Sequence, residues 1–158
     1  MRTIFVSAAF ALAGCGQTAN EPVAPPAAPP PSVAQAPNLA LEPLHVADTA
    51  GRLGGELGCS FRAGDDQVLI ASGIVASETP SEALMKLGGV VVEMDATTTG
   101  GFDTLEDGEA FAAGGVSAVV ATTSAVATGT EEVRHNATLT VSADGGERVY
   151  EGVWSCGP

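Results

Sequence analysis

The chain has 158 residues, which is the usual length of a single domain. Its formal net charge is −13, because 6 Lys and Arg residues stand against 19 Asp and Glu residues. A field of that sign repels phosphate groups, so the composition disfavours nucleic acid and anionic lipid surfaces as partners and is consistent with basic ones.

Residues 1–14 combine a positive start with a short apolar run. Arg2 precedes the run TIFVSAAFALAG, an arrangement typical of a secretory signal peptide. The run is shorter than the about 20 apolar residues that a membrane-spanning helix needs. A buried core helix does not fit either, because a proline-rich segment follows at once. We therefore expect residues 1–14 to be a cleaved signal peptide.

The sequence Leu12-Ala13-Gly14-Cys15 at the end of this run resembles the bacterial lipobox, the signal that the lipoprotein-processing machinery reads. The resemblance implies cleavage before Cys15, a thioether-linked diacylglycerol on its sulfur and an acyl chain on the new amino group. Two or three lipid chains anchor a protein firmly, whereas one anchors it weakly. The chain thus resembles a lipoprotein of the bacterial cell envelope. By analogy with enteric sorting, Gly16 after the modified cysteine implies the outer membrane, facing the periplasm.

Residues 15–44 form the next segment, in which eight prolines fall between Gly16 and Pro43 and no periodic apolar face appears. Proline removes backbone donors and favours extended polyproline II. Such a segment is a disordered tether that could reach roughly 85 Å at about 3.1 Å per residue. The alternative is a docking peptide for a proline-binding module.

Residues 45–158 carry the signals of an all-β domain. Runs rich in Val, Ile and Thr, the strand-forming residues, occur at 67–75, 90–96, 116–126 and 137–143. Residues 137–143 alternate apolar and polar side chains, and Asp144-Gly145 after them predicts a β-hairpin. Asp65-Asp66 predicts another hairpin turn. Gly152 indicates a bulge or a close backbone approach. Short strands at this spacing predict a small antiparallel sandwich or barrel.

The segment TPSEALMKLGG is ambiguous. Thr79, Pro80 and Glu82 read as the start of a helix, and Gly88 reads as its end. Ala83, Met85 and Leu87 also alternate as in a strand. We expect a short helical turn here.

The two remaining cysteines lie at opposite ends of the domain. Lipidation of Cys15 leaves Cys59, near the start, and Cys156, at the end. Export from the cytosol places them where disulfides persist, so we expect a Cys59–Cys156 bridge that ties the last strand to the first. The alternatives are a metal pair or a catalytic thiol. Neither has support, because no Cys-x-x-Cys spacing occurs and no histidine lies near a cysteine.

Tyr150 and Trp154 share one face of the last predicted strand, because they are separated by an even number of residues. We expect both to lie in the core beside the disulfide. If exposed, they would be the most plausible contact with a partner.

The sequence predicts no catalytic site, no metal site and no cofactor other than the covalent lipid on Cys15. Asp103, Glu106, Asp107 and Glu109 lack the spacing of a calcium loop, so we expect a solvated turn. His45 and His135 are candidate general bases, but no nucleophile motif frames either one. The segment GRLGGELG lacks the strand and spacing of a phosphate-binding loop and reads as a flexible lead-in to the first strand.

Three short motifs, GRLGGELGCSF, GGFD and GVWSCGP, give residues 51–158 a resemblance to a group of small uncharacterised alphaproteobacterial lipoproteins, which implies no activity. The leading interpretation is a non-enzymatic envelope lipoprotein, a binding or structural module on a tether. A further option is an assembly or stability factor for another envelope complex. An alternative is a lysozyme inhibitor, since such inhibitors are similar in having a lipobox and a small disulfide-closed β-barrel. Their WSKG-like signature is replaced here by WSCG. An envelope hydrolase using His135 or the acidic cluster is the competing class.

Overall fold

The computed structural model describes residues 38–126 and 132–158. The predicted signal peptide, the lipidation site Cys15 and most of the predicted tether therefore lie outside the described residues. The described elements, in chain order, are β1 (Leu41–Glu42), α1 (Val46–Thr49), β2 (Leu57–Ala63), β3 (Asp66–Gly73), β4 (Glu82–Leu87), β5 (Val90–Ala96), the 3₁₀-helix η1 (Gly101–Thr104), β6 (Ala110–Ala113), β7 (Val116–Val126), β8 (Val133–Ala143) and β9 (Gly146–Gly157).

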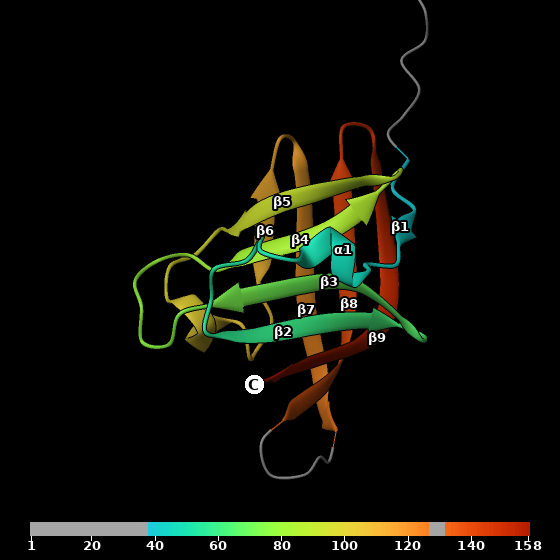
Figure 1. The fold of residues 1–158 in the computed structure, drawn as a ribbon. Coiled ribbons are helices and arrows are strands. Elements are labelled where there is room, and N and C mark those ends of the chain that lie inside the picture. The colour runs from blue at the N-terminus through green and yellow to red at the C-terminus, as the bar shows by residue number, and fades with distance from the viewer. Residues whose placement is uncertain (1–37, 127–131) are drawn as a thin grey trace, which may run out of the picture. The chain divides into compact units, whose positions relative to one another are not determined.

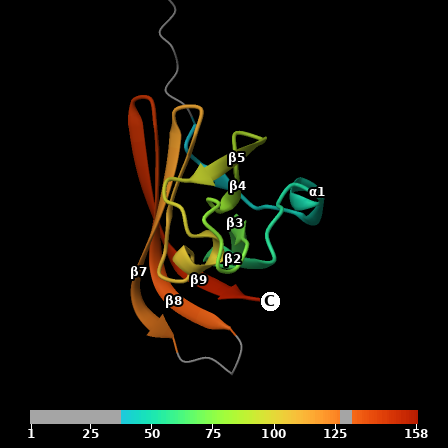
Figure 2. The same ribbon diagram turned by 90° about the vertical axis from the view of Figure 1, so that its left-hand side faces the viewer.

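Eight of the described strands form a closed antiparallel barrel. From β2 to β9 each strand pairs with the next one in the chain, and β9 returns to pair with β2. Strands β2 to β5 cross strands β7 to β9 at a steep angle (Figure 1), and a view from the side shows these two groups as separate layers (Figure 2). The prediction of a small antiparallel sandwich or barrel is confirmed, and the structure is a barrel.

The alternation read from the sequence determines which side of each strand faces inward. In β8, Ala137, Leu139 and Val141 are buried, and the polar residues between them are not. The predicted hairpin at Asp144-Gly145 joins β8 to β9, with Ala143 opposite Gly146. The first predicted hairpin also forms, although its two turn residues are Gly64 and Asp65 rather than Asp65 and Asp66.

Gly152 in β9 marks a close backbone approach, as predicted. A Cβ atom at this position would lie 2.1 Å from the carbonyl oxygen of Arg62 and 2.7 Å from Cζ of Phe61. Real Cβ atoms essentially never come this close to a neighbour. Glycine at this position therefore allows the β2–β9 seam to close over the large Phe61 ring.

The helical turn expected within residues 79–88 is wrong, because Glu82–Leu87 is the strand β4. Ala83 and Met85 point into the barrel and are fully buried, so the alternating pattern was the correct signal. The residues that resembled helix caps have other roles. The Glu82 carboxylate accepts a hydrogen bond from the Gly54 N–H, and Gly88, with φ +56°, lies in the turn to β5.

The packed domain begins earlier than residue 45. Leu39 is 5% exposed and belongs to the barrel core, and β1 pairs with Lys86 and Leu87 of β4, beyond the residues of β4 that pair with β3. Strand β3 in turn ends at Gly73, two residues before the predicted end at residue 75. A Cβ atom at Gly73 would meet the backbone of η1 at 2.4 Å, so the chain turns away there.

Residues 44–54 run across the outer side of β3, β4 and β5 as a strap, rather than forming a flexible lead-in. The strap is held by two ion pairs, Lys86 with Asp48 at 3.2 Å and Arg52 with Glu93 at 2.6 Å. Leu84 points away from the barrel interior, because its neighbours in β4 point inward, yet it is only 1% exposed. Figure 2 shows α1 of the strap outside the barrel. The strap therefore gives the acidic domain a small second layer.

Candidate functional site

The predicted disulfide is present and joins the first and last strands of the barrel. Cys59 in β2 lies directly opposite Cys156 in β9, and the two sulfur atoms are bonded. Both residues are 2% exposed and belong to the core. The bridge therefore fastens the seam at which the barrel closes, and both thiols are consumed in this structural role.

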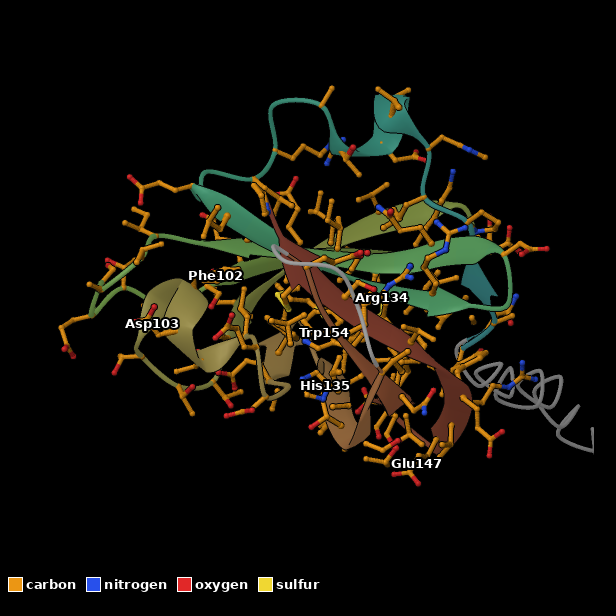
Figure 3. The ribbon with its side chains drawn as sticks, turned by 90° about the horizontal axis from the view of Figure 1, so that it is seen from below. Phe102, Asp103, Arg134, His135, Glu147 and Trp154 are labelled. Carbon is orange, nitrogen blue, oxygen red and sulfur yellow. A yellow bond between two sulfur atoms is a disulfide. The ribbon has the colours of Figure 1, made fainter. Side chains whose placement is uncertain are left out.

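Trp154 lies in the core next to this bridge, as expected. It pairs with Phe61 across the seam, is fully buried, and donates a hydrogen bond from Nε1 to the Leu105 carbonyl oxygen at 2.6 Å. Figure 3 shows it at the centre of the barrel beside His135. The condition under which Trp154 would contact a partner, exposure of its side chain, is not met in this structure.

Tyr150 is half-buried and acts on the N-terminal segment of the described chain rather than on the disulfide. Its hydroxyl donates to the Leu39 carbonyl oxygen at 2.7 Å and accepts from the Leu41 N–H at 3.2 Å. One side chain thus satisfies two backbone groups and holds Leu39 in the core. Both hydrogen bonds of the Tyr150 hydroxyl are therefore made within the domain.

An open groove of about 530 Å³ lies on the outside of the barrel, next to the disulfide. We call it the seam groove. It is lined by Gly58, Cys59, Ser60, Gln67, Ile70, Glu132, Ser155, Cys156, Gly157 and Pro158. Two hydroxyls, an amide and a carboxylate can hydrogen-bond a ligand there, and Arg134 donates from Nε to Ser155 Oγ at 3.1 Å. The lining of the seam groove contains no histidine.

The two histidines belong to different elements, His45 preceding α1 and His135 lying in β8. His45 precedes α1, where its backbone N–H donates to the Asp48 carboxylate at 2.9 Å. This bond, together with Lys86, lowers the pKa of Asp48. His135 is half-buried opposite Trp154 and Ala125. Within the described residues, none of the hydrogen bonds found joins the His135 side chain to a hydroxyl or carboxylate.

The acidic segment after η1 is only partly the solvated turn that the sequence predicts. Asp103 and Asp107 are exposed, whereas Glu109 is 7% exposed. The Glu109 carboxylate accepts a hydrogen bond from Thr98 Oγ1 at 2.5 Å and another from the Ala110 N–H at 2.8 Å. Burial without a cation is tolerated because these donors satisfy the oxygens. Within residues 38–126 and 132–158, no group of three His, Cys, Asp or Glu side chains is arranged to hold a metal ion.

The exposed loop between β3 and β4 was not predicted from the sequence. Ile74 and Val75, expected at the end of a strand, are 43% and 44% exposed. The loop joins two strands of one layer and packs on η1, which Figure 3 locates through its labels for Phe102 and Asp103. The only available signal was the glycine at position 73, which ends the strand just before these two residues.

No family model, curated protein or solved structure matches the chain. Among the described residues, no helix is long and apolar enough to cross a membrane.

Proposed function

We propose that the protein is a lipid-anchored lipoprotein of the bacterial envelope whose barrel is a non-enzymatic binding module. The anchor is supported by the lipobox resemblance at Leu12–Cys15 and by the leader before it. The proline-rich tether places the domain away from the membrane. The Cys59–Cys156 bridge is consistent with this location, since disulfides persist in oxidising compartments.

One observation carries the binding role: the barrel interior is filled. Trp154, Phe61, Phe111 and Leu139 are fully buried, and one continuous core contains them. A barrel of eight strands is just wide enough either for such side chains or for one small ligand, and here the side chains occupy the space. A partner must therefore bind the outer surface. The outer surface also lacks, within the described residues, a histidine hydrogen-bonded to a nucleophile.

The lysozyme-inhibitor alternative is favoured by a specific combination of features. The closed barrel with one bridging disulfide is the architecture that the resemblance implied. The chain's net charge of −13 suits a basic enzyme. Likeness at the level of architecture is an analogy, because one fold serves many functions. This candidate stands second, since the family's signature sequence is altered in this chain.

Labelling with a palmitate analogue in a Gram-negative host tests the anchor. The wild-type chain is expected to incorporate the label and to sediment with membranes. Cys15→Ser is expected to incorporate none and to keep its leader, whereas Cys59→Ser, the matched control, keeps the label. Label that persists in Cys15→Ser, or that is absent from the wild type, would contradict the proposal.

A muramidase assay separates the two candidates. The detergent-extracted full chain is mixed with hen lysozyme and bacterial cell walls. Unchanged hydrolysis at a large excess of the chain removes the inhibitor alternative and leaves the general binding role. Stoichiometric slowing promotes the alternative to the leading function.

A further inference from the structure

The loop between β3 and β4, residues 74–81, projects from one end of the barrel (Figure 1). We call it the β3–β4 loop. Ile74 and Val75, adjacent at its start, are among the seven large hydrophobic residues that the described chain exposes. Isolated exposed apolar residues are ordinary, but an adjacent pair on a projecting loop forms a small apolar tip. Strand β1, where the described chain enters the barrel, lies at the opposite end (Figure 1).

The β3–β4 loop is fixed at both ends. The Phe102 N–H donates to the Ile74 carbonyl oxygen at 3.1 Å, and the Gly101 N–H donates to that of Thr79 at 3.0 Å. Ser81, which is 1% exposed, donates from Oγ to the Gly101 carbonyl oxygen at 2.8 Å. A loop that is already ordered loses little conformational entropy when a partner binds, so its exposed residues can contribute affinity.

Inside the loop, Ala76 has φ +53° and is the one non-glycine residue of the described chain with a positive φ. This left-handed conformation is unfavourable for a residue with a side chain. The hydrogen bonds to η1 keep it in place. Strained backbone of this kind is more common at binding sites than elsewhere in proteins.

The charged residues of the β3–β4 loop, of η1 and of residues 54–57 are all acidic. Glu56, Glu78 and Glu82 are exposed, and the Val75 N–H donates to Glu56 Oε2 at 3.4 Å. Glu82 lines a cavity of about 70 Å³ together with Ile74. No Lys or Arg occurs in the loop, in η1 or in residues 54–57.

The basic side chains of the described chain are largely paired elsewhere. Arg52 and Lys86 bind the carboxylates of Glu93 and Asp48, Arg62 donates to the carbonyl oxygen of Asp65, and Arg134 pairs with Glu132. Arg52 also lines a small pocket with Glu82, but its guanidinium pairs with Glu93, so the three carboxylates around the tip leave a net negative charge there.

We propose that the β3–β4 loop is the docking surface of the module and that its partner is a cationic protein with an apolar patch. This inference rests on the proposed binding function and names its surface and partner chemistry. Ile74 and Val75 would be buried at the centre of the contact, and the three carboxylates at its rim would meet Lys or Arg. A second copy of the chain and an anionic lipid surface carry the wrong charge.

Site-specific photo-crosslinking in the cells that make the protein tests the inference. A photoreactive residue replaces Val75 in the full lipidated chain, and the matched control replaces Val149, which is 59% exposed in β9. The Val75 position is expected to capture a basic protein, identified by mass spectrometry, and the control is not. A chain carrying Glu56→Gln, Glu78→Gln and Glu82→Gln is expected to capture about tenfold less of it.

Binding to that purified protein provides the second measurement. Ile74→Ser with Val75→Ser is expected to weaken binding by about tenfold or more, and Val149→Ser is expected to leave it unchanged. The substituted side chains are all exposed, so we expect each variant to fold. Native fluorescence of the buried Trp154 checks that it does.

Several outcomes would overturn the inference: capture of a neutral or acidic protein, of lipid or of a second copy at Val75, or no product there. A product from the Val149 position alone would overturn this surface and leave the binding function standing. Lipidated chains that capture no protein at either position would count against both.

Discussion

Removal of the Cys59–Cys156 bridge is the perturbation whose cost can be worked out most fully. The variant carries Cys59→Ala and Cys156→Ala, so that neither thiol can form a wrong bridge. The two cysteines are 97 residues apart in the chain. In the chain-entropy model, a bridge that closes a loop of about this length stabilises a protein by about 4.7 kcal/mol.

The hydrogen-bonded seam remains when the bridge is gone. Five residue pairs, from Gly58 with Gly157 to Arg62 with Val153, still join β2 to β9. A domain of this size is stable by about 6–17 kcal/mol on the usual scale per residue. We therefore expect a folded barrel whose free energy of unfolding falls by about 4–5 kcal/mol and whose thermal midpoint falls by roughly 15–20 °C.

Urea unfolding monitored by tryptophan fluorescence measures this loss. The chain has a single tryptophan, Trp154, and it is buried at the seam, so its emission reports on closure of the barrel. The wild type in reductant is the matched control and is expected to unfold together with the double variant. A difference below about 1 kcal/mol between oxidised wild type and variant would refute the argument from loop closure.

Three further predictions follow from particular contacts. Gly152→Ala places a Cβ against the β2 backbone and the Phe61 ring, so we expect a loss of about 1–3 kcal/mol in urea unfolding, whereas Gly146→Ala, whose nearest neighbour is a leucine methyl at 3.3 Å, should cost far less. Tyr150→Phe removes the hydroxyl that pairs two backbone groups, so we expect a loss of about 1–3 kcal/mol and faster hydrogen exchange in β1. The pKa of Asp48 is lowered in the folded state, so its contribution is present above about pH 4 and is lost as the pH falls further. The difference in unfolding free energy between wild type and Asp48→Asn should therefore be constant from about pH 5 to 8 and shrink below about pH 4.

The strands of the barrel were predictable where one face is buried and the other is exposed to solvent. Residues 137–143 show this, because Leu139 and Val141 face the core and the intervening Thr and Ser residues do not. Strand β4 was mispredicted because Leu84 interrupts its alternation: Leu84 lies on the outer face between Glu82 and Lys86, where the strap buries it. One apolar residue on the polar face weakens the period of two, and the residues around the strand that resemble helix caps then dominate the local signal.

The elements of the candidate sites were predictable to different degrees. The bridge followed from the number of cysteines once Cys15 is assigned to lipid. The exposure of Ile74 and Val75 was not predictable, because it depends on the packing of η1 against Gly73. Gly101, the first residue of η1, is 28 residues from Gly73 in the sequence. The burial of Glu109 likewise depends on a hydroxyl from another loop, that of Thr98. Both are tertiary effects that no local pattern contains.

Intact-mass spectrometry of the protein extracted from membranes tests the lipid anchor and the disulfide together. We expect a chain that begins at Cys15 and carries a diacylglycerol and an acyl chain. We also expect that no thiol can be alkylated before reduction and that two can be alkylated afterwards. A chain that begins at Met1 with a free Cys15 thiol would contradict the lipid anchor, and two thiols free before reduction would contradict the closed seam.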